Sequence, residues 1–171
     1  IKVANDKTVN SIIINEGSAR ELKLTGEGTV SNLEAQGDIT VTASTDTKLT
    51  NIAVAEGKTL TTSGAVTAGS ITGTGNVIAG DALTVTNDIN AASVTATGAL
   101  TATKVTAGTV KAESVNADVK ADSLELTDSG AVTVNDSSKT WEVGTLKTNG
   151  ALTVKDASKL NAKSIESTGD L

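Results

Sequence analysis

The stretch from Gly64 to Thr103, GAVTAGSITGTGNVIAGDALTVTNDINAASVTATGALTAT, decides the fold of this 171-residue chain. Single aliphatic residues stand five or six positions apart in it, and small, hydroxyl-bearing or turn-forming residues occupy the positions between them. A step this short fits one brief β-strand followed by a turn, because successive side chains of a strand point to opposite faces. The same step extends to Val115, through Val66, Ile71, Val77, Leu83, Ile89, Val94, Leu100, Val105 and Val110.

A longer repeat contains these steps. Gly or Asp, a small residue, an aliphatic residue and Thr recur at intervals of 17, 17, 32, 20 and 19 residues, where 32 fits two coils of 16. Such copies begin at Gly64, Asp81, Gly98, Gly130 and Gly150, and the last interval ends at Gly169. A period of about 16–20 residues is too short for a pair of helices and suits one turn of a solenoid.

Three steps make one coil, so we predict an all-β fold, a right-handed parallel β-helix of about nine coils. Each coil has 16–20 residues and three short strands with a turn at every corner. The right hand follows the general preference of parallel crossovers. Residues 37–171 are predicted to form the repetitive solenoid and to continue beyond this fragment. Residues 1–36 fit the repeat least well and are expected to form irregular or atypical first coils.

The composition excludes several chemistries. The chain has no His, Cys, Met, Pro, Tyr or Phe, so Cys/His metal sites, thiol nucleophiles, histidine triads and disulfides are excluded. We predict no catalytic residue, no metal and no cofactor. A net charge of −6 with one arginine, Arg20, argues against nucleic acid as a partner. The longest aliphatic run, Ile12 to Ile14, is far shorter than the roughly 20 residues of a membrane span.

Repeats of the Gly98-Ala99-Leu100-Thr101 kind resemble the β-helical shafts of large bacterial surface exoproteins. The filamentous-haemagglutinin type of two-partner secretion adhesin is the nearest in style, and autotransporter passengers and some surface-layer proteins are similar. The resemblance covers roughly residues 37–171 and lies in composition and period. It implies an extracellular or cell-surface location. The chain lacks the Asn-Pro motifs typical of that family's secretion domain, because it has no proline.

Carboxylates are the residues to weigh for catalysis, because glycoside hydrolysis needs two of them about 5–10 Å apart. The densest local set is Asp118, Asp122, Glu125 and Asp128. They stand beside Lys120 and small residues, with no aromatic side chain near them to stack on a sugar ring. We therefore interpret them as solvated outward charges and expect the protein not to be an enzyme.

Two further patterns have a simple structural interpretation. The glycine pairs Gly26-Glu27-Gly28 and Gly73-Thr74-Gly75 lack the aspartate of calcium-binding repeats, so we interpret them as turns. Thr-x-Thr pairs such as those of an ice-binding face occur at Thr40/Thr42, Thr84/Thr86 and Thr101/Thr103. Later repeats place Asn135 and Lys155 at the second position, so ordinary outward strand threonines are favoured.

Trp141 is the only aromatic residue, and two roles are open for it. It either makes a contact at the surface or packs inside a coil that the local repeat widens to 20 residues. The ends form another candidate site, because Ile12, Ile13 and Ile14 are apolar on both alternating faces and Leu171 lies inside a repeat. We expect self-association end to end, or contact with the rest of a longer chain.

The expected function is that of a non-enzymatic structural segment of an extracellular or bacterial cell-surface protein. An adhesin shaft, a rod, a filament and a surface-layer assembly all fit. A host or surface receptor, or a glycan, is the partner expected besides the protein itself. The alternatives are an inactive portion of a β-helical polysaccharide-active enzyme and a glycan- or ice-binding module.

Overall fold

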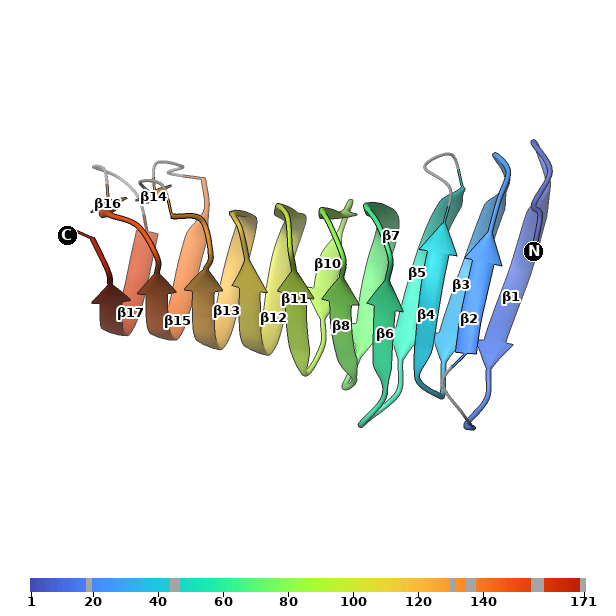
Figure 1. The fold of residues 1–171 in the computed structure, drawn as a ribbon, viewed down its shortest axis with the longest axis horizontal. Helices are drawn as coiled ribbons and strands as arrows, with labels where there is room; N and C mark the ends of the chain where they lie inside the picture. The colour runs from blue at the N-terminus through green and yellow to red at the C-terminus, as the bar shows by residue number, and fades with distance from the viewer. Residues whose placement is uncertain (18–19, 44–46, 130–131, 135–137, 155–158, 170–171) are drawn as a thin grey trace.

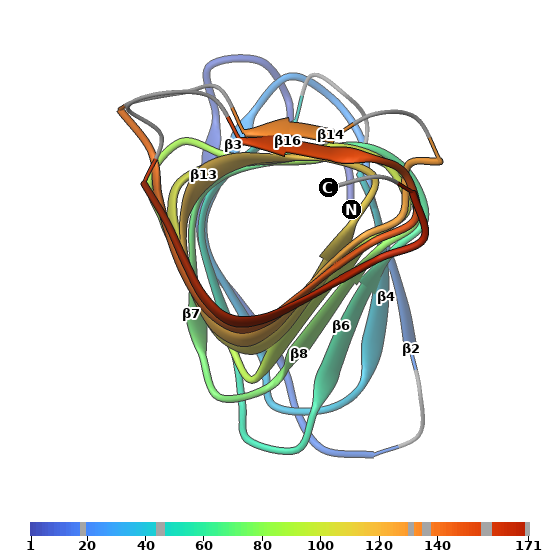
Figure 2. The same ribbon diagram turned by 90° about the vertical axis from the view of Figure 1, so that its left-hand side faces the viewer.

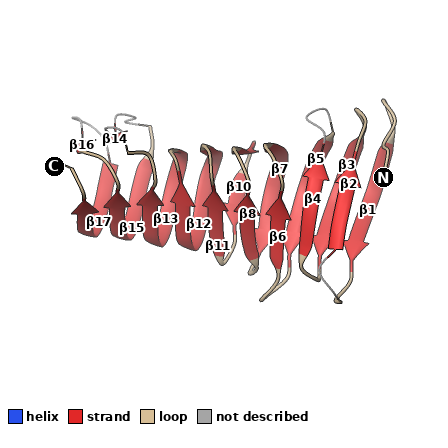
Figure 3. Cartoon of the chain, viewed as in Figure 1, coloured by secondary structure: helices blue, strands red, loops and turns tan. Residues whose placement is uncertain are grey.

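The structure, a computed structural model, describes residues 1–17, 20–43, 47–129, 132–134, 138–154 and 159–169. Throughout these residues the regular elements are β-strands, drawn red in Figure 3, and every pair of neighbouring strands is parallel. A 15-stranded sheet wraps around the molecule, and β14 pairs with β16 in a separate two-stranded sheet. The prediction of an all-β parallel solenoid is confirmed.

The strands lie on three sides of the solenoid, which we name sides A, B and C. Side A contains β9 (Leu83–Val85), β14 (Val132–Val134), β16 (Leu152–Val154) and the first residues of β1 (Thr8–Ile14), β3 (Thr29–Ala35), β5 (Lys48–Val54), β7 (Val66–Gly73), β12 (Leu100–Ala112) and β13 (Val115–Leu126). Side B contains β10 (Asp88–Asn90), the rest of β1, β3, β5 and β7, the middle of β12 and β13, and the first halves of β15 (Thr140–Thr148) and β17 (Lys159–Ser167). Side C contains β2 (Arg20–Leu24), β4 (Ile39–Ala43), β6 (Thr59–Thr62), β8 (Asn76–Ala79), β11 (Ser93–Ala96) and the last residues of β12, β13, β15 and β17.

The solenoid is right-handed. In Figure 1 the chain advances from the N-terminus on the right to the C-terminus on the left. The strands of side C run upward on the near side, and those of side B run downward behind them. Figure 2 agrees, because the chain runs counterclockwise as it approaches the viewer.

The coils are less uniform than the sequence predicted. The coils of β1 to β6 contain two strand elements each, because β5 begins on side A, where Leu49 pairs with Ala68, and continues on side B, where Asn51 pairs with Ser70; β1 and β3 follow the same register. Figure 2 shows the consequence, since the first coils enclose an elongated section and the last a triangular one. The solenoid makes about seven turns, and the expected number of about nine differs somewhat from this. The first strands, β1, β2 and β3, already belong to the main sheet, because β1 pairs with β3 and β2 pairs with β4.

The core consists of stacked columns of inward side chains. The column of side B contains Ile12, Leu33, Ile52, Ile71, Ile89, Val105, Val119, Trp141 and Leu160. The column of side C contains Ile39, Leu60, Val77, Val94, Val110, Leu124, Leu146 and Ile165. All but Leu160 and Ile165, both in β17, are buried. Full burial of one such aliphatic side chain contributes about 1.5–3 kcal/mol.

A second column on side C places two threonines inside the core. Thr62 and Thr148 are 2 % and 0 % exposed, and the column also contains Leu22, Val41 and Ala79. Each buried hydroxyl donates to the carbonyl oxygen two residues further on, Thr62 to Gly64 at 3.2 Å and Thr148 to Gly150 at 2.9 Å. Each buried hydroxyl is therefore hydrogen-bonded to a nearby backbone carbonyl oxygen, at the corner where side C ends.

Candidate functional site

The four carboxylates weighed for catalysis do not form one site. The Asp118 Oδ1 on side B accepts a hydrogen bond from the backbone N–H of Thr140 at 2.7 Å. The Glu125 Oε1 on side C lies 2.9 Å from the Lys111 Nζ. Asp122 stands at the corner between them, and Asp128 is exposed after the end of β13. Since β13 turns this corner, Asp118 and Glu125 belong to different sides of the solenoid (Figure 2).

A shallow hollow of about 520 Å³ places Asp122 near a carboxylate that the sequence did not single out, Glu142 of the next coil. Lys120 and Lys163 line the same hollow, and all four side chains are exposed. A second hollow, of about 660 Å³, is lined by Asn5, Glu27, Lys48, Thr50, Thr67 and Thr86, among others. Among the described residues, no group of three or more Asp and Glu side chains has the arrangement of a metal site.

The glycine pairs lie at positions where neighbouring coils approach closely. Gly26 and Gly73 have φ angles of +96° and +128°, and a Cβ on them would lie 2.2 Å from the Val3 O and 2.0 Å from the Val54 O. A Cβ on Gly28 or Gly75 would meet backbone oxygens at 2.5 Å and 2.3 Å. A backbone approach this close requires glycine, which agrees with the interpretation of these pairs as turns.

The threonine pairs do not form one array. Thr67, Thr84 and Thr101 stack on side A through direct strand pairing. The Thr86 and Thr103 hydroxyls donate to the carbonyl oxygens of Ala68 and Thr86 in the preceding coil, at 3.4 Å and 3.0 Å. These second threonines therefore join coils to one another. The other pair, Thr40/Thr42, lies on side C, where the Thr42 Oγ1 is 2.8 Å from the Ser63 Oγ.

Trp141 lies in the inward column of side B, between Val119 and Leu160. It is 6 % exposed, and its Nε1–H donates to the carbonyl oxygen of Ala117 at 3.1 Å. The indole thus occupies a position that other coils give to Ile, Leu or Val. Of the two roles that the sequence left open, a surface contact and packing inside a coil, this placement corresponds to packing.

The residues proposed for end-to-end contact have unequal exposure. Ile12 is 9 % exposed, Ile13 is 50 % exposed and Ile14 is half-buried. Leu171 lies outside the described residues. An end-to-end contact between two copies would bring an elongated coil against a triangular one (Figure 2), so the two sections would overlap only in part.

Polar ladders on the outside were missed by the sequence reasoning. On side B, the Asn51 Nδ2 donates to the Asn32 Oδ1 at 3.2 Å, and the Ser70 hydroxyl donates to the Asn51 Oδ1 at 2.9 Å. On side C, the Ser93 hydroxyl donates to the Asn76 Oδ1 at 2.8 Å. The recurrence of Asn32, Asn51 and Ser70 every 19 residues was the available signal. These side chains join neighbouring coils as the backbone ladder does.

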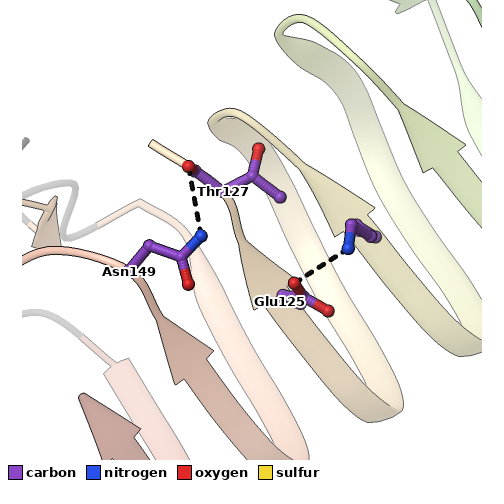
Figure 4. A network of polar contacts seen from close by, with 4 residues as sticks. Glu125, Thr127 and Asn149 are labelled. Atoms are coloured by element: carbon purple, nitrogen blue, oxygen red, sulfur yellow. Dashed lines mark hydrogen bonds and ion pairs between the residues drawn. The ribbon is translucent and has the colours of Figure 1, made fainter. Parts of the chain in front are cut away.

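A second missed feature is an alternation of charge on side C. Strand pairing places Lys111 beside Glu125, Glu125 beside Lys147 and Lys147 beside Glu166. We name these four residues the charge column. Figure 4 shows Glu125 with its ion pair to the preceding coil, and Asn149, whose Nδ2 donates to the Thr127 carbonyl oxygen at 3.4 Å. Since like charges directly opposite one another destabilise a sheet, alternation favours this stacking of coils.

A separate ion pair links two N-terminal loops. The Lys58 Nζ lies 2.9 Å from the Glu16 Oε1, and both groups are open to solvent. The hydrogen bond and the charge of Lys58 lower the pKa of the Glu16 carboxyl, and those of Glu16 raise the pKa of Lys58. A solvent-exposed pair of this kind adds little to stability and is screened by salt.

Comparisons with family profiles, with curated proteins and with solved structures find no match for this chain. A search of the described residues for a helix with the length and apolar character of a membrane span also finds none. The fold and the surface columns are therefore the basis for any statement about function.

Proposed function

We propose that the chain is a non-enzymatic structural segment of an extracellular or bacterial cell-surface protein, serving as a rod or shaft. An adhesin shaft, a filament and a surface-layer assembly are the settings that fit this role. The bacterial surface setting rests on the resemblance of the Gly-Ala-Leu-Thr repeats to exoprotein shafts.

The observation that carries the proposal is the continuity of the stack. The inward column of side B runs from Ile12 in β1 to Leu160 in β17, and backbone pairing joins each of its coils to the next. Outside the core, ladders such as Asn32, Asn51 and Ser70 add side-chain hydrogen bonds between coils. A body in which each coil contacts only its neighbours gives length and resists bending, which are the properties of a spacer.

Self-association end to end, or stacking on the rest of a longer chain, extends the same rod. Ile13 is a contact residue for it on the first coil, where it is 50 % exposed. A receptor or glycan then binds elsewhere in the assembly, while this segment sets the distance from the cell surface.

Stiffness tests the proposal directly. A small globular marker is fused to each end of the chain, and the distance between markers is measured by electron microscopy of single particles. A rod gives one narrow distribution of distances. A broad distribution, as for a flexible chain, would refute the proposal.

The enzyme alternative is tested on the same protein. Wild type and the variant D118N/D122N/E125Q/D128N are incubated with a panel of polysaccharides, and a second variant adds Glu142→Gln to cover the hollow beside Asp122. We expect no cleavage by any of the three. Cleavage by wild type that either variant loses would replace the structural role with an enzymatic one.

A further inference from the structure

Side C of the last four coils is a sheet face with three outward columns. Its middle is the charge column of Lys111, Glu125, Lys147 and Glu166. A hydroxyl column flanks it, with Thr109, Ser123, Thr145 and Ser164 in register. On the other flank Glu113, Thr127, Asn149 and Thr168 each follow the inward residue after the charge. The charges on this face therefore lie mostly in one line at the spacing of the coils.

We propose that this face binds a second copy of the chain, with the two solenoids side by side and antiparallel. The column reads plus, minus, plus, minus along the axis, so its reversed copy reads minus, plus, minus, plus. A two-fold axis parallel to the strands, passing between the coils of Glu125 and Lys147, reverses the order of coils and keeps each column opposite itself. It places Lys111 opposite Glu166 of the second copy and Glu125 opposite Lys147 of that copy. The face is thus complementary in charge to itself, as an isologous interface requires.

The same pattern discriminates against other arrangements. Two copies side by side and parallel would place Lys111 opposite Lys111 and Glu125 opposite Glu125, so every pair would repel. A slip of one coil in the antiparallel pair also aligns like charges. The flanking columns add no conflict, because hydroxyl residues face hydroxyl residues and Glu113 faces Thr168 across the axis. A parallel pair shifted by one coil would oppose unlike charges at three coils, whereas the antiparallel pair in this register does so at all four, so charge favours the antiparallel arrangement.

The contacts inside one chain leave this face available. Lys111 and Glu125 form an ion pair within the chain, yet the Lys111 side chain remains 45 % exposed and the Glu125 side chain 28 % exposed. Lys147 and Glu166 are both exposed. Each charge can accordingly interact with a neighbour on its own column and with the opposite charge of a second column. The proposal does not depend on the role of the chain as a spacer.

The size of the face sets the strength of the pair. Four strands about 4.8 Å apart, each about five residues of about 3.3 Å long, present a face of roughly 300 Å². This area is well below the roughly 800 Å² per partner of a standard interface, so the dimer is weak. Screening shortens electrostatic reach to about 8 Å at physiological ionic strength and about 3 Å at 1 M salt, so association is favoured by low salt.

Sedimentation equilibrium over a wide range of concentrations tests association. Near 0.01 M salt wild type forms dimers, and at about 1 M salt the dimer constant falls by about tenfold or more. The variant K111E/K147E, with an all-acidic column, stays monomeric, and so does E125K/E166K, with an all-basic column. Mixing these two variants restores the dimer. The control K2E/K7E has the same change of net charge on exposed residues of the first coil and still dimerises.

Cross-linking tests the orientation. A zero-length reagent that joins an amine to a carboxylate should link Lys111 to Glu166, as read by mass spectrometry of a mixture of isotope-labelled and unlabelled chains. Within one chain these residues lie three coils apart, about 14 Å, which such a link cannot span.

A monomer at all salt concentrations would overturn the proposal. A dimer that K111E/K147E retains, or one without the Lys111–Glu166 link, would also overturn it. Circular dichroism of each variant confirms folding, and the exchanged column K111E/E125K/K147E/E166K, which keeps the alternation, should dimerise like wild type.

Discussion

Gly73 tests how closely the coils approach at the end of β7. Its φ of +128° lies in a region that other residues rarely adopt, and a Cβ there would lie 2.0 Å from the Val54 carbonyl oxygen. The obstacle is backbone of the preceding coil, so it cannot rotate away as a side chain would. Gly73→Ala must therefore strain its own backbone and also push two stacked coils apart.

The expected cost can be separated into its two causes. A non-glycine residue at such a φ costs about 1–3 kcal/mol, and overpacking costs about another 1–3 kcal/mol, so Gly73→Ala loses about 2–6 kcal/mol. Gly57→Ala is the control for the first cause alone, because Gly57 has a φ of +69° and no atom within 4 Å of the added Cβ; it should lose about 1–2 kcal/mol. Gly64→Ala meets neither obstacle, so its stability should stay level or rise by about 0.4–1 kcal/mol.

Thermal unfolding followed by far-ultraviolet circular dichroism measures all three variants. At about 2–4 °C per kcal/mol for a chain of this size, Gly73→Ala lowers Tm by at least about 4 °C. The order of Tm is Gly64→Ala highest, then Gly57→Ala, then Gly73→Ala. The reasoning would be refuted by a Gly73→Ala protein as stable as Gly64→Ala, since the coils would then have room for a methyl group at that corner.

Three other substitutions test single features of the structure. Trp141→Ala removes the 6 % exposed indole from the side B column and should cost about 3–5 kcal/mol in denaturant unfolding; a cost near zero would contradict the packing of the indole. Thr62→Val removes the buried donor to the Gly64 carbonyl and should cost about 1 kcal/mol, whereas exposed Thr67→Val should stay within about 0.5 kcal/mol; equal values would rule out a role for the buried hydroxyl. The Glu16 carboxyl has a lowered pKa, so its ion pair contributes above the unfolded pKa of Glu and is lost as pH falls through the folded pKa. Tm profiles of wild type and Glu16→Gln should therefore converge at acid pH, and a gap that persists there would contradict the assignment.

The regular spacing of aliphatic residues was sufficient to predict a parallel solenoid. Positions such as Val77, Val94 and Val110 are all inward and fully buried, as a step of five or six residues requires. The two-stranded first coils could not be predicted in this way. In β3 both Val30 and Leu33 are buried although they stand three positions apart, because the strand bends between them at Ser31 and Asn32. Ser and Asn favour turns, but here the strand continues through the bend, so the sequence does not show that sides A and B share one strand.

The surface was harder to predict than the core for a related physical reason. Most inward residues are hydrophobic and can be recognised one at a time, with Thr62 and Thr148 as exceptions. The role of an outward residue depends on the residue that stacks on it in the next coil. Members of the charge column stand 14, 22 and 19 residues apart, because loops at the corners absorb different lengths of chain without disturbing the stack. In the sequence, Glu125 is therefore interpreted as one solvated carboxylate among several. Strand pairing places it between Lys111 and Lys147, where it is one position of the charge column. In a solenoid, interaction surfaces are thus defined by columns across coils, and substitutions that test function should change a column rather than a sequence motif.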